Sequence, residues 1–209
     1  MSADDVDRCL QTISELVVNP GFDQVAYLVP DIYEAIDEWN SILGEQEWKV
    51  YLYSPETLPQ SGFRGESAQF AMRLALTSTS PQFELIQPID GPSIYHEWIE
   101  RRGFGPHHVG RFVTDIEESM SRLRAIGFEP AQWGTGYGLD GDGGFAYYEL
   151  GEQGETVVEL IQPPKRRRQP EAIESPRTTR LTEGSSDAHV QRTDGAGAPR
   201  LAGKPERAA

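Results

Sequence analysis

Short stretches of alternating apolar and polar residues are separated along the chain by two stretches with helical spacing. Residues 23 to 29 and 107 to 113 are rich in β-branched and aromatic side chains, which predicts strands. Each is followed by an aspartate suited to an N-cap, with a glutamate three residues later. The pattern predicts amphipathic helices from Asp31 to about Leu43 and from Asp115 to about Ile126.

Three further strands are predicted after each helix, which gives the order βαβββ twice. Between the two units, the segment SIYHEWIERRG (93 to 103) predicts a linking helix that begins at Ser93 and ends at Gly103. Residues 5 to 17 predict an additional helix near the N-terminus. The six predicted strands span 47 to 53, 68 to 76, 82 to 88, 128 to 134, 143 to 150 and 155 to 162.

The two units also repeat each other in sequence. Val25 and Val29 recur as Val109 and Val113 at a spacing of 84 residues, and the dipeptide Asp-Ile follows at the same spacing. A second pair of matching segments follows in the same order: FELIQP (83 to 88) matches VELIQP (158 to 163). Two matches in the same order indicate that the unit is duplicated. We therefore expect one domain over residues 20 to 164, made of repeats 20 to 90 and 104 to 164, after an extension over residues 1 to 19.

Alternation along the strands sorts the side chains onto two faces. Neighbouring residues of a strand point to opposite sides, so Val25 and Val29 face the helix and Gln24 faces away. The repeat then matches His108 to Gln24, and alternation places His107 on the opposite face, on the strand surface or facing a helix. The last strand of each unit adds one carboxylate to the face of Gln24. The candidate ligands on this face are Gln24, Glu84, His108 and Glu159.

Paired βαβββ units with one such residue on the first and last strand of each resemble the vicinal oxygen chelate superfamily. Its members include glyoxalase I, methylmalonyl-CoA epimerase, extradiol dioxygenases and bleomycin-resistance proteins. The resemblance covers about residues 20 to 163 and implies an α+β fold whose curved mixed sheet surrounds a divalent metal. The ligand set is similar to that of glyoxalase I, whereas the epimerases typically have a histidine where this chain has Gln24.

The resemblance implies a metal-dependent lyase, isomerase or epimerase that acts on a small-molecule carbonyl or thioester. Carboxylates, an amide oxygen and one imidazole suit Zn²⁺, Ni²⁺, Co²⁺ or Mn²⁺. By resemblance, Glu159 is the leading catalytic base and Glu84 the alternative, and Glu66 corresponds to an acid/base partner of the epimerases.

Two other functions stay open. One is a metal-free small-molecule binding or resistance protein with the same fold. The other is an extradiol-type dioxygenase, although that iron chemistry uses two histidines and one carboxylate and Gln24 occupies one of the histidine positions.

Charge is distributed unevenly and limits the partners. Residues 1 to 164 carry 9 basic and 27 acidic side chains, a net charge of −18, which argues against nucleic acid and, more mildly, against polyanionic CoA substrates. The sequence leaves open whether the protein forms a homodimer. No apolar run is long enough to suggest a membrane span, and the single Cys9 cannot form an internal disulfide. We therefore expect a cytoplasmic protein without a membrane partner.

The C-terminal composition predicts disorder. Residues 165 to 209 are rich in Pro, Gly, Ser, Thr, Arg and Ala, and they carry a net charge of +4. The basic run at 165 to 168 is interpreted as a solvated junction, with a small anionic docking patch as the alternative. The glycine-rich stretch GTGYGLDGDGG (134 to 144) lacks the Lys-Ser/Thr of a phosphate-binding loop and predicts a mobile hairpin loop beside the site.

Overall fold

The two predicted βαβββ units are present in the computed structural model, which describes residues 3–151 and 154–175. These residues all lie in one compact unit, Met1–Arg177. The first repeat contains β1 (Gln24–Leu28), α2 (Ile32–Leu43), β2 (Trp48–Tyr53), β5 (Ala71–Leu76) and β6 (Gln82–Asp90). The second contains β7 (Gly105–Phe112), α4 (Ile116–Ala125), β8 (Gln132–Thr135), β9 (Gly144–Leu150) and β10 (Thr156–Gln162).

Five further elements are added to the two repeats. Helix α1 (Ala3–Leu16) precedes the first repeat, and α3 (Ile94–Arg102) links the two, as the sequence predicts. The hairpin of β3 (Gln60–Phe63) and β4 (Glu66–Ser67) interrupts the first repeat, and β11 (Ala172–Glu174) follows the second. The described helices are too short or too polar to cross a bilayer.

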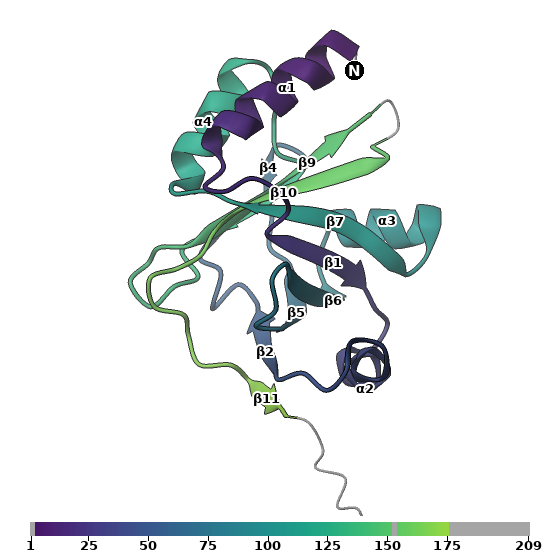
Figure 1. Cartoon of the computed structure of the whole chain (residues 1–209). Coiled ribbons are helices and arrows are strands. Elements are labelled where there is room, and N and C mark those ends of the chain that lie inside the picture. Colours follow the sequence, from purple (N-terminus) through teal and green to yellow (C-terminus); the bar gives the residue numbers. More distant parts are fainter. Residues whose placement is uncertain (1–2, 152–153, 176–209) are drawn as a thin grey trace, which may run out of the picture. The chain divides into compact units, whose positions relative to one another are not determined.

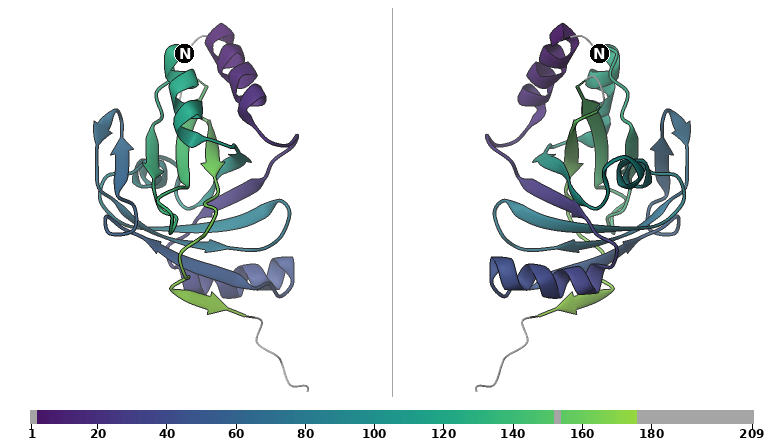
Figure 2. Two further views of the ribbon diagram at one scale, coloured as in Figure 1. Left: turned by 90° about the vertical axis from the view of Figure 1, so that its left-hand side faces the viewer. Right: turned by 90° about the vertical axis from the view of Figure 1, so that its right-hand side faces the viewer.

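One strongly curved sheet joins all the described strands, in the order β11-β2-β5-β6-β1-β7-β10-β9-β8-β3-β4. The repeats meet at its centre, where β1 pairs antiparallel with β7. On either side, β6 runs parallel to β1 and β10 runs parallel to β7. Figures 1 and 2 show the sheet bending around its inner face, with α2 on the outside of one half and α4 on the outside of the other. The predicted α+β fold with a curved mixed sheet is confirmed.

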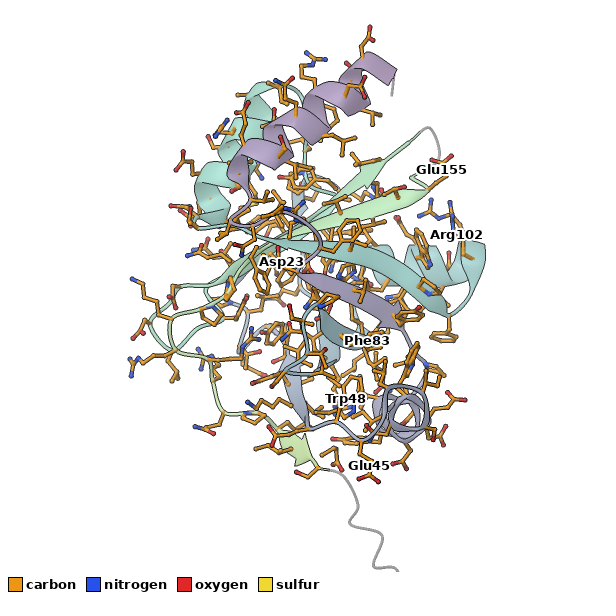
Figure 3. All side chains as sticks on the ribbon, viewed as in Figure 1. Asp23, Glu45, Trp48, Phe83, Arg102 and Glu155 are labelled. Carbon is orange, nitrogen blue, oxygen red and sulfur yellow. The ribbon has the colours of Figure 1, made fainter. Side chains whose placement is uncertain are left out.

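Helices cover the outer face with apolar side chains. Ile32, Ala35 and Ile36 of α2 pack on the outward-facing residues of the first repeat. Two of these outward residues, Trp48 and Phe83, lie together beside α2 in Figure 3, and their ring centroids are 6.1 Å apart. In the second repeat, α4 and α1 together cover the corresponding face. The outer face therefore supplies the core that the alternation of the strands predicts.

Aromatic residues dominate the inner face. Tyr51 and Tyr53 of β2 and Phe145 and Tyr147 of β9 are buried there, and α3 contributes a further aromatic cluster. Burial of such large side chains contributes much of the hydrophobic free energy of folding. The inner face is therefore closely packed around the polar residues at its centre.

Aspartate caps begin both repeat helices, as predicted. Asp31 accepts hydrogen bonds from the backbone N–H groups of Tyr33 and Glu34, at 2.9 and 3.0 Å. Asp115 accepts one from the N–H of Glu118 at 2.9 Å. These contacts satisfy N–H groups that have no partner within the first helical turn.

The prediction that disorder begins at residue 165 is wrong for residues 165–175. Strand β11 pairs antiparallel with β2, and Arg73 forms two contacts with Glu171, at 3.1 and 3.2 Å. Composition predicted disorder because this segment cannot form a core by itself. The edge of β2 offers unpaired backbone groups, and these give the segment a partner. Residues 176–209 lie outside the described residues.

The β3–β4 hairpin was not predicted. Its strand β3 pairs with β8, so a segment of the first repeat extends the sheet at the far end of the second. The hairpin is short, and its burial pattern carries no clear alternation. Its pairing therefore depends on an edge that only the folded second repeat provides.

Replacing Asp31 by Ala should lower the free energy of unfolding by about 1 kcal/mol, because two N–H groups at the start of α2 lose their acceptor. Asp31→Asn retains an acceptor and should lose much less. Urea denaturation of the three proteins measures the difference. Equal losses in both variants would show that charge near the helix terminus, rather than capping, carries the effect.

Candidate metal centre

The four central strands place polar residues in two rows on the inner face. In one row, Ala26 of β1 pairs with Glu84 of β6 on one side and with His108 of β7 on the other. In the next row, Gly110 of β7 pairs with Gln24 on one side and with Glu159 of β10 on the other. Each row therefore has the smallest side chains at its centre and metal-competent ones beside them.

Gly110 leaves the space that the Gln24 amide occupies. A Cβ atom at Gly110 would lie 2.8 Å from Oε1 of Gln24 and 2.8 Å from Cδ1 of Ile161. Both distances are far below ordinary van der Waals contact. A glycine at this position in the strand thus marks a close approach between side chains on the inner face.

Two carboxylates converge on His108. Its Nε2 lies 3.0 Å from Oε2 of Glu159 and 3.3 Å from Oε2 of Glu84. One ligand atom from each residue can be chosen so that all three lie within 4.8 Å of one another. All three residues are buried, at 4% to 5% exposure. Buried carboxylates require a partner that compensates their negative charge, so this cluster requires positive charge nearby.

The unpaired atoms of this cluster fit a cation. Despite their proximity, Oε2 of Glu84, Nε2 of His108 and Oε2 of Glu159 have no partner with hydrogen-bond geometry among the described residues, and neither does Oε1 of Gln24. Four buried polar atoms that lack a hydrogen bond in one place are unusual in a folded protein. Two carboxylates, an imidazole and an amide oxygen are suitable ligands for a divalent metal ion.

Gln82 fixes the direction of the Gln24 amide. Nε2 of Gln24 donates to Oε1 of Gln82 at 3.0 Å, and Nε2 of Gln82 donates to the carbonyl of Thr77 at 3.0 Å. Because Nε2 of Gln24 donates in this chain, Oε1 of Gln24 is the amide atom left without a hydrogen-bond partner. The oxygen is also the amide atom that can bind a metal ion.

Burial and mutual contact shift the pKa values in the cluster. Burial raises the pKa of Glu84 to about 7; the contact with His108 opposes this shift, and the charge of Glu159 adds to it. For His108, burial lowers the pKa, but the contacts with Glu159 and Glu84 outweigh it and raise the pKa to about 9. Without a metal, His108 is therefore an imidazolium at neutral pH, and a divalent ion must displace its proton.

His107 departs from the predicted alternation. Between Ala26 and Tyr27 the pairing of β1 steps from His108 to Pro106, which makes His107 an extra residue in a β-bulge. Its Nδ1 lies 2.9 Å from Nδ1 of His108, so the prediction that the two rings point to opposite faces is wrong. His107 does face a helix, because its ring lies 5.0 Å from that of Trp98 in α3.

The environment of His107 keeps its ring neutral. Burial, and then the charges of His108 and Arg101, lower the pKa of His107 well below its usual value. A neutral His107 can accept a hydrogen bond from Nδ1–H of His108, which leaves Nε2 of His108 to face the carboxylates. His107 is thus placed to orient His108.

A cavity of about 30 Å³ opens onto this cluster. The lining includes Gln24, Glu84 and Glu159 on one side and Tyr53, Tyr137 and Arg167 on the other.

Arg167, Tyr53 and Tyr137 were not singled out as site residues by the sequence. Arg167 belongs to the basic run that was interpreted as a solvated junction or a docking patch, and it is half-buried at the cavity. Tyr137 lies in the glycine-rich stretch predicted as a loop beside the site, and its ring stacks on Tyr53 with centroids 5.0 Å apart. The sequence signals for Tyr137 are its place in this loop and its aromatic side chain, which is typical of a core or pocket residue.

The structure does not bring Glu66 to this site. It is exposed in β4 and lines a separate cavity of about 340 Å³ near Arg124 and Trp133. The predicted correspondence with an acid/base glutamate rested on the loop before the third strand. That loop is instead the β3–β4 hairpin, which turns away to pair with β8.

Comparison with known proteins agrees with the fold. A family model described as Glyoxalase/Bleomycin resistance protein/Dioxygenase superfamily matches residues 23–148. Among solved structures, a methylmalonyl-CoA epimerase from Streptomyces coelicolor in complex with 2-nitronate-propionyl-CoA is 13% identical, with a TM-score of 0.50, covering 70% of this chain and 96% of that one. Methylmalonyl-CoA epimerase from Mycobacterium tuberculosis is 23% identical, with a TM-score of 0.48 and coverage of 71% and 89%. Among curated proteins, no sequence matches the chain significantly.

We expect the metal-free protein to lose stability as pH rises. The folded-state pKa values of Glu84 and His108 are both raised, so folding binds protons between the unfolded values, 4.5 and 6.5, and the folded values of about 7 and about 9. Each stabilising contribution is complete below the unfolded pKa and is lost as pH passes the folded pKa. The slope should approach about 1.4 kcal/mol per pH unit for each proton.

Thermal unfolding of chelator-treated protein between about pH 6 and pH 9 measures this slope. A saturating divalent ion should remove it, because metal binding releases the proton of His108. His108→Gln should remove the part of the slope between about pH 7 and pH 9, where His108 titrates, and leave the contribution of Glu84. A melting temperature that rises with pH in the metal-free wild type would contradict the assigned direction.

Proposed function

The chain belongs to the Glyoxalase/Bleomycin resistance protein/Dioxygenase superfamily, and on that premise we propose that it is a metal-dependent lyase, isomerase or epimerase. Its reaction moves a proton at a carbon next to the carbonyl of a ketone, aldehyde or thioester. The observation that carries this proposal is the buried cluster of Glu84, His108 and Glu159, in which each residue has a polar atom without a hydrogen-bond partner among the described residues.

Gln24, Glu84, His108 and Glu159 would hold the ion. Their oxygen and nitrogen donors suit Zn²⁺, Ni²⁺, Co²⁺ or Mn²⁺. When bound, a divalent ion supplies Lewis-acid polarisation of the substrate carbonyl and stabilises the negative charge that develops on its oxygen.

The chain itself supplies the proton acceptor. A carboxylate takes the proton from the carbon next to the carbonyl, holds it, and returns it to the opposite face of that carbon or to a neighbouring atom. Glu159 is the leading candidate and Glu84 the alternative. Both carboxylates line the cavity, so either lies within reach of a substrate bound there.

A metal-free binding protein is the alternative function. In that case the four polar atoms would need partners from a ligand or from water, because leaving them unpaired in a buried site is costly. The donor set supports an extradiol dioxygenase less well, because that chemistry uses two histidines with one carboxylate. Among the described residues, only His108 converges with the carboxylates.

Metal binding should depend on His108 much more than on His107. We expect the purified protein to bind about one divalent ion per chain. His108→Ala and Glu159→Ala should abolish binding, because each removes a ligand. His107→Ala removes only the group that orients His108 and should weaken binding by about 10- to 100-fold.

Elemental analysis and calorimetric titration with Zn²⁺, Ni²⁺, Co²⁺ and Mn²⁺ provide the measurement, and circular dichroism checks that each variant is folded. Equal loss in the His107 and His108 variants would mean that the bulge orients the two rings differently. Full retention of metal by folded His108→Ala would overturn the ligand assignment.

Glu159→Gln should abolish exchange of the activated hydrogen for deuterium in D₂O without unfolding the protein. The amide keeps the size of the carboxylate but cannot take a proton. The assay uses metal-loaded protein and a panel of 2-oxo-thiol adducts, 2-methyl acyl thioesters and ring ketones, followed by NMR. Glu84→Gln is the matched variant, and the metal content of both is measured in parallel.

If Glu84→Gln stops exchange while Glu159→Gln retains it, the two roles are reversed. If the metal-loaded wild type exchanges no compound but binds one tightly and leaves it unchanged, the binding-protein alternative is correct.

A further inference from the structure

Residues 163–171 form a strap that crosses from the end of the second repeat to the edge of the first. On one side, N–H of Lys165 donates to Oδ2 of Asp142 at 2.9 Å, and the carbonyl of Arg166 accepts from N–H of Leu139 at 2.9 Å. On the other side, N–H of Glu171 donates to the carbonyl of Val50 at 2.8 Å, just before β11 pairs with β2. The strap is therefore fixed at both ends.

Its middle residue, Arg167, is held at the cavity by aromatic groups. Nη1 of Arg167 donates to the hydroxyl of Tyr53 at 3.1 Å. The guanidinium carbon lies 5.2 Å from the ring centroid of Tyr51 and 5.7 Å from that of Tyr137. Such contacts stabilise a guanidinium and leave its charge in place.

The neighbours of Arg167 in the basic run have other partners. Arg166 pairs with Asp140, and Nε of Arg168 donates to the carbonyl of Tyr137 at 3.1 Å. Among residues 3–151 and 154–175, no carboxylate forms an ion pair with Arg167, and one Tyr53 hydroxyl takes up only one of its five N–H donors. Arg167 lines the same cavity as Gln24, Glu84 and Glu159.

The balance of charge in a loaded site favours a bound anion. Metal ligands bind in their deprotonated forms, so the carboxylates of Glu84 and Glu159 would neutralise a divalent ion, and His108 and Gln24 would be neutral. The charge of Arg167 would then have no counter-charge on the inner face. A half-buried guanidinium without a counter-charge is unfavourable, and a planar carboxylate matches its fork of donors.

We propose that Arg167 binds the carboxylate of the substrate, so that the substrate is a small carbonyl compound with a carboxylate close to the carbonyl. This inference rests on the proposed function for the carbonyl and adds the recognised anion. The small cavity favours a carboxylate over a phosphate, because a carboxylate is the less bulky anion. Arg167 thereby sets specificity, and proton transfer is left to Glu159 or Glu84 across the cavity.

Pyruvate and pyruvamide provide a matched pair of probes, since they share size and carbonyl and differ in the negative charge. Calorimetric titration of Zn²⁺-loaded and of metal-free protein gives the affinity for each. Wild type should prefer pyruvate by about 10- to 100-fold. Arg167→Gln should lose this preference, and Arg167→Lys should retain only part of it because lysine lacks the fork.

Arg166→Gln is the control, because it weakens the contact between the strap and Asp140 and leaves the charge at the cavity unchanged. It should keep the preference for pyruvate. Loss of the preference in Arg166→Gln as well as in Arg167→Gln would overturn the proposal, since strap position rather than the Arg167 charge would then explain binding. Equal affinity of wild type for the two probes would also overturn it.

The two proposals can fail separately. If the wild type binds no divalent ion, the metal-dependent function fails; a pyruvate preference that Arg167→Gln abolishes in the metal-free protein would still support the carboxylate subsite. If the metal binds but neither probe depends on Arg167, the metal site stands and the carboxylate subsite does not.

Discussion

Two buried carboxylates beside a single histidine are the constraint on which the rest of this structure depends. Glu84 and Glu159 come from the last strands of different repeats, and His108 lies between them in sheet order. Carboxylates at this depth are tolerated only with compensating positive charge or full hydrogen bonding. The register of the central strands, the bulge at His107 and the small residues Ala26 and Gly110 all serve to bring these groups together without filling the space between them.

The outer and inner faces of the sheet have different roles. Apolar residues packed beneath α2, α4 and α1 form the cores of the two repeats on the outer face. The inner face can then carry polar groups at its centre, with tyrosines around them. Burial raises the pKa values of Tyr53, Tyr137 and Tyr147, so their hydroxyls stay neutral beside the carboxylates. The alternation of each strand thus places the residues that stabilise the fold on the outer face and the polar residues of the site on the inner face.

Segments outside the repeat connect the two halves of the sheet, and one of them completes the site. Strand β11 and the strap tie the end of the second repeat to the edge of the first, and the β3–β4 hairpin of the first repeat pairs with β8 of the second. Each addition crosses from one repeat to the other. The strap contributes the cationic side of the cavity through Arg167, whereas the strands contribute its acidic side. A duplicated unit alone would have supplied the acidic side only.

The sequence by itself determined the duplicated βαβββ order, the helix caps and the face on which Gln24, Glu84, His108 and Glu159 lie, because strand alternation and capping are local properties. Three features were decided by the tertiary structure. The bulge that turns His107 toward His108, the pairing of β11 with an open edge and the position of Arg167 over the cavity all depend on contacts between residues far apart in the chain. The local pattern of apolar and polar residues does not encode such contacts. They form only once the sheet has curved around its inner face.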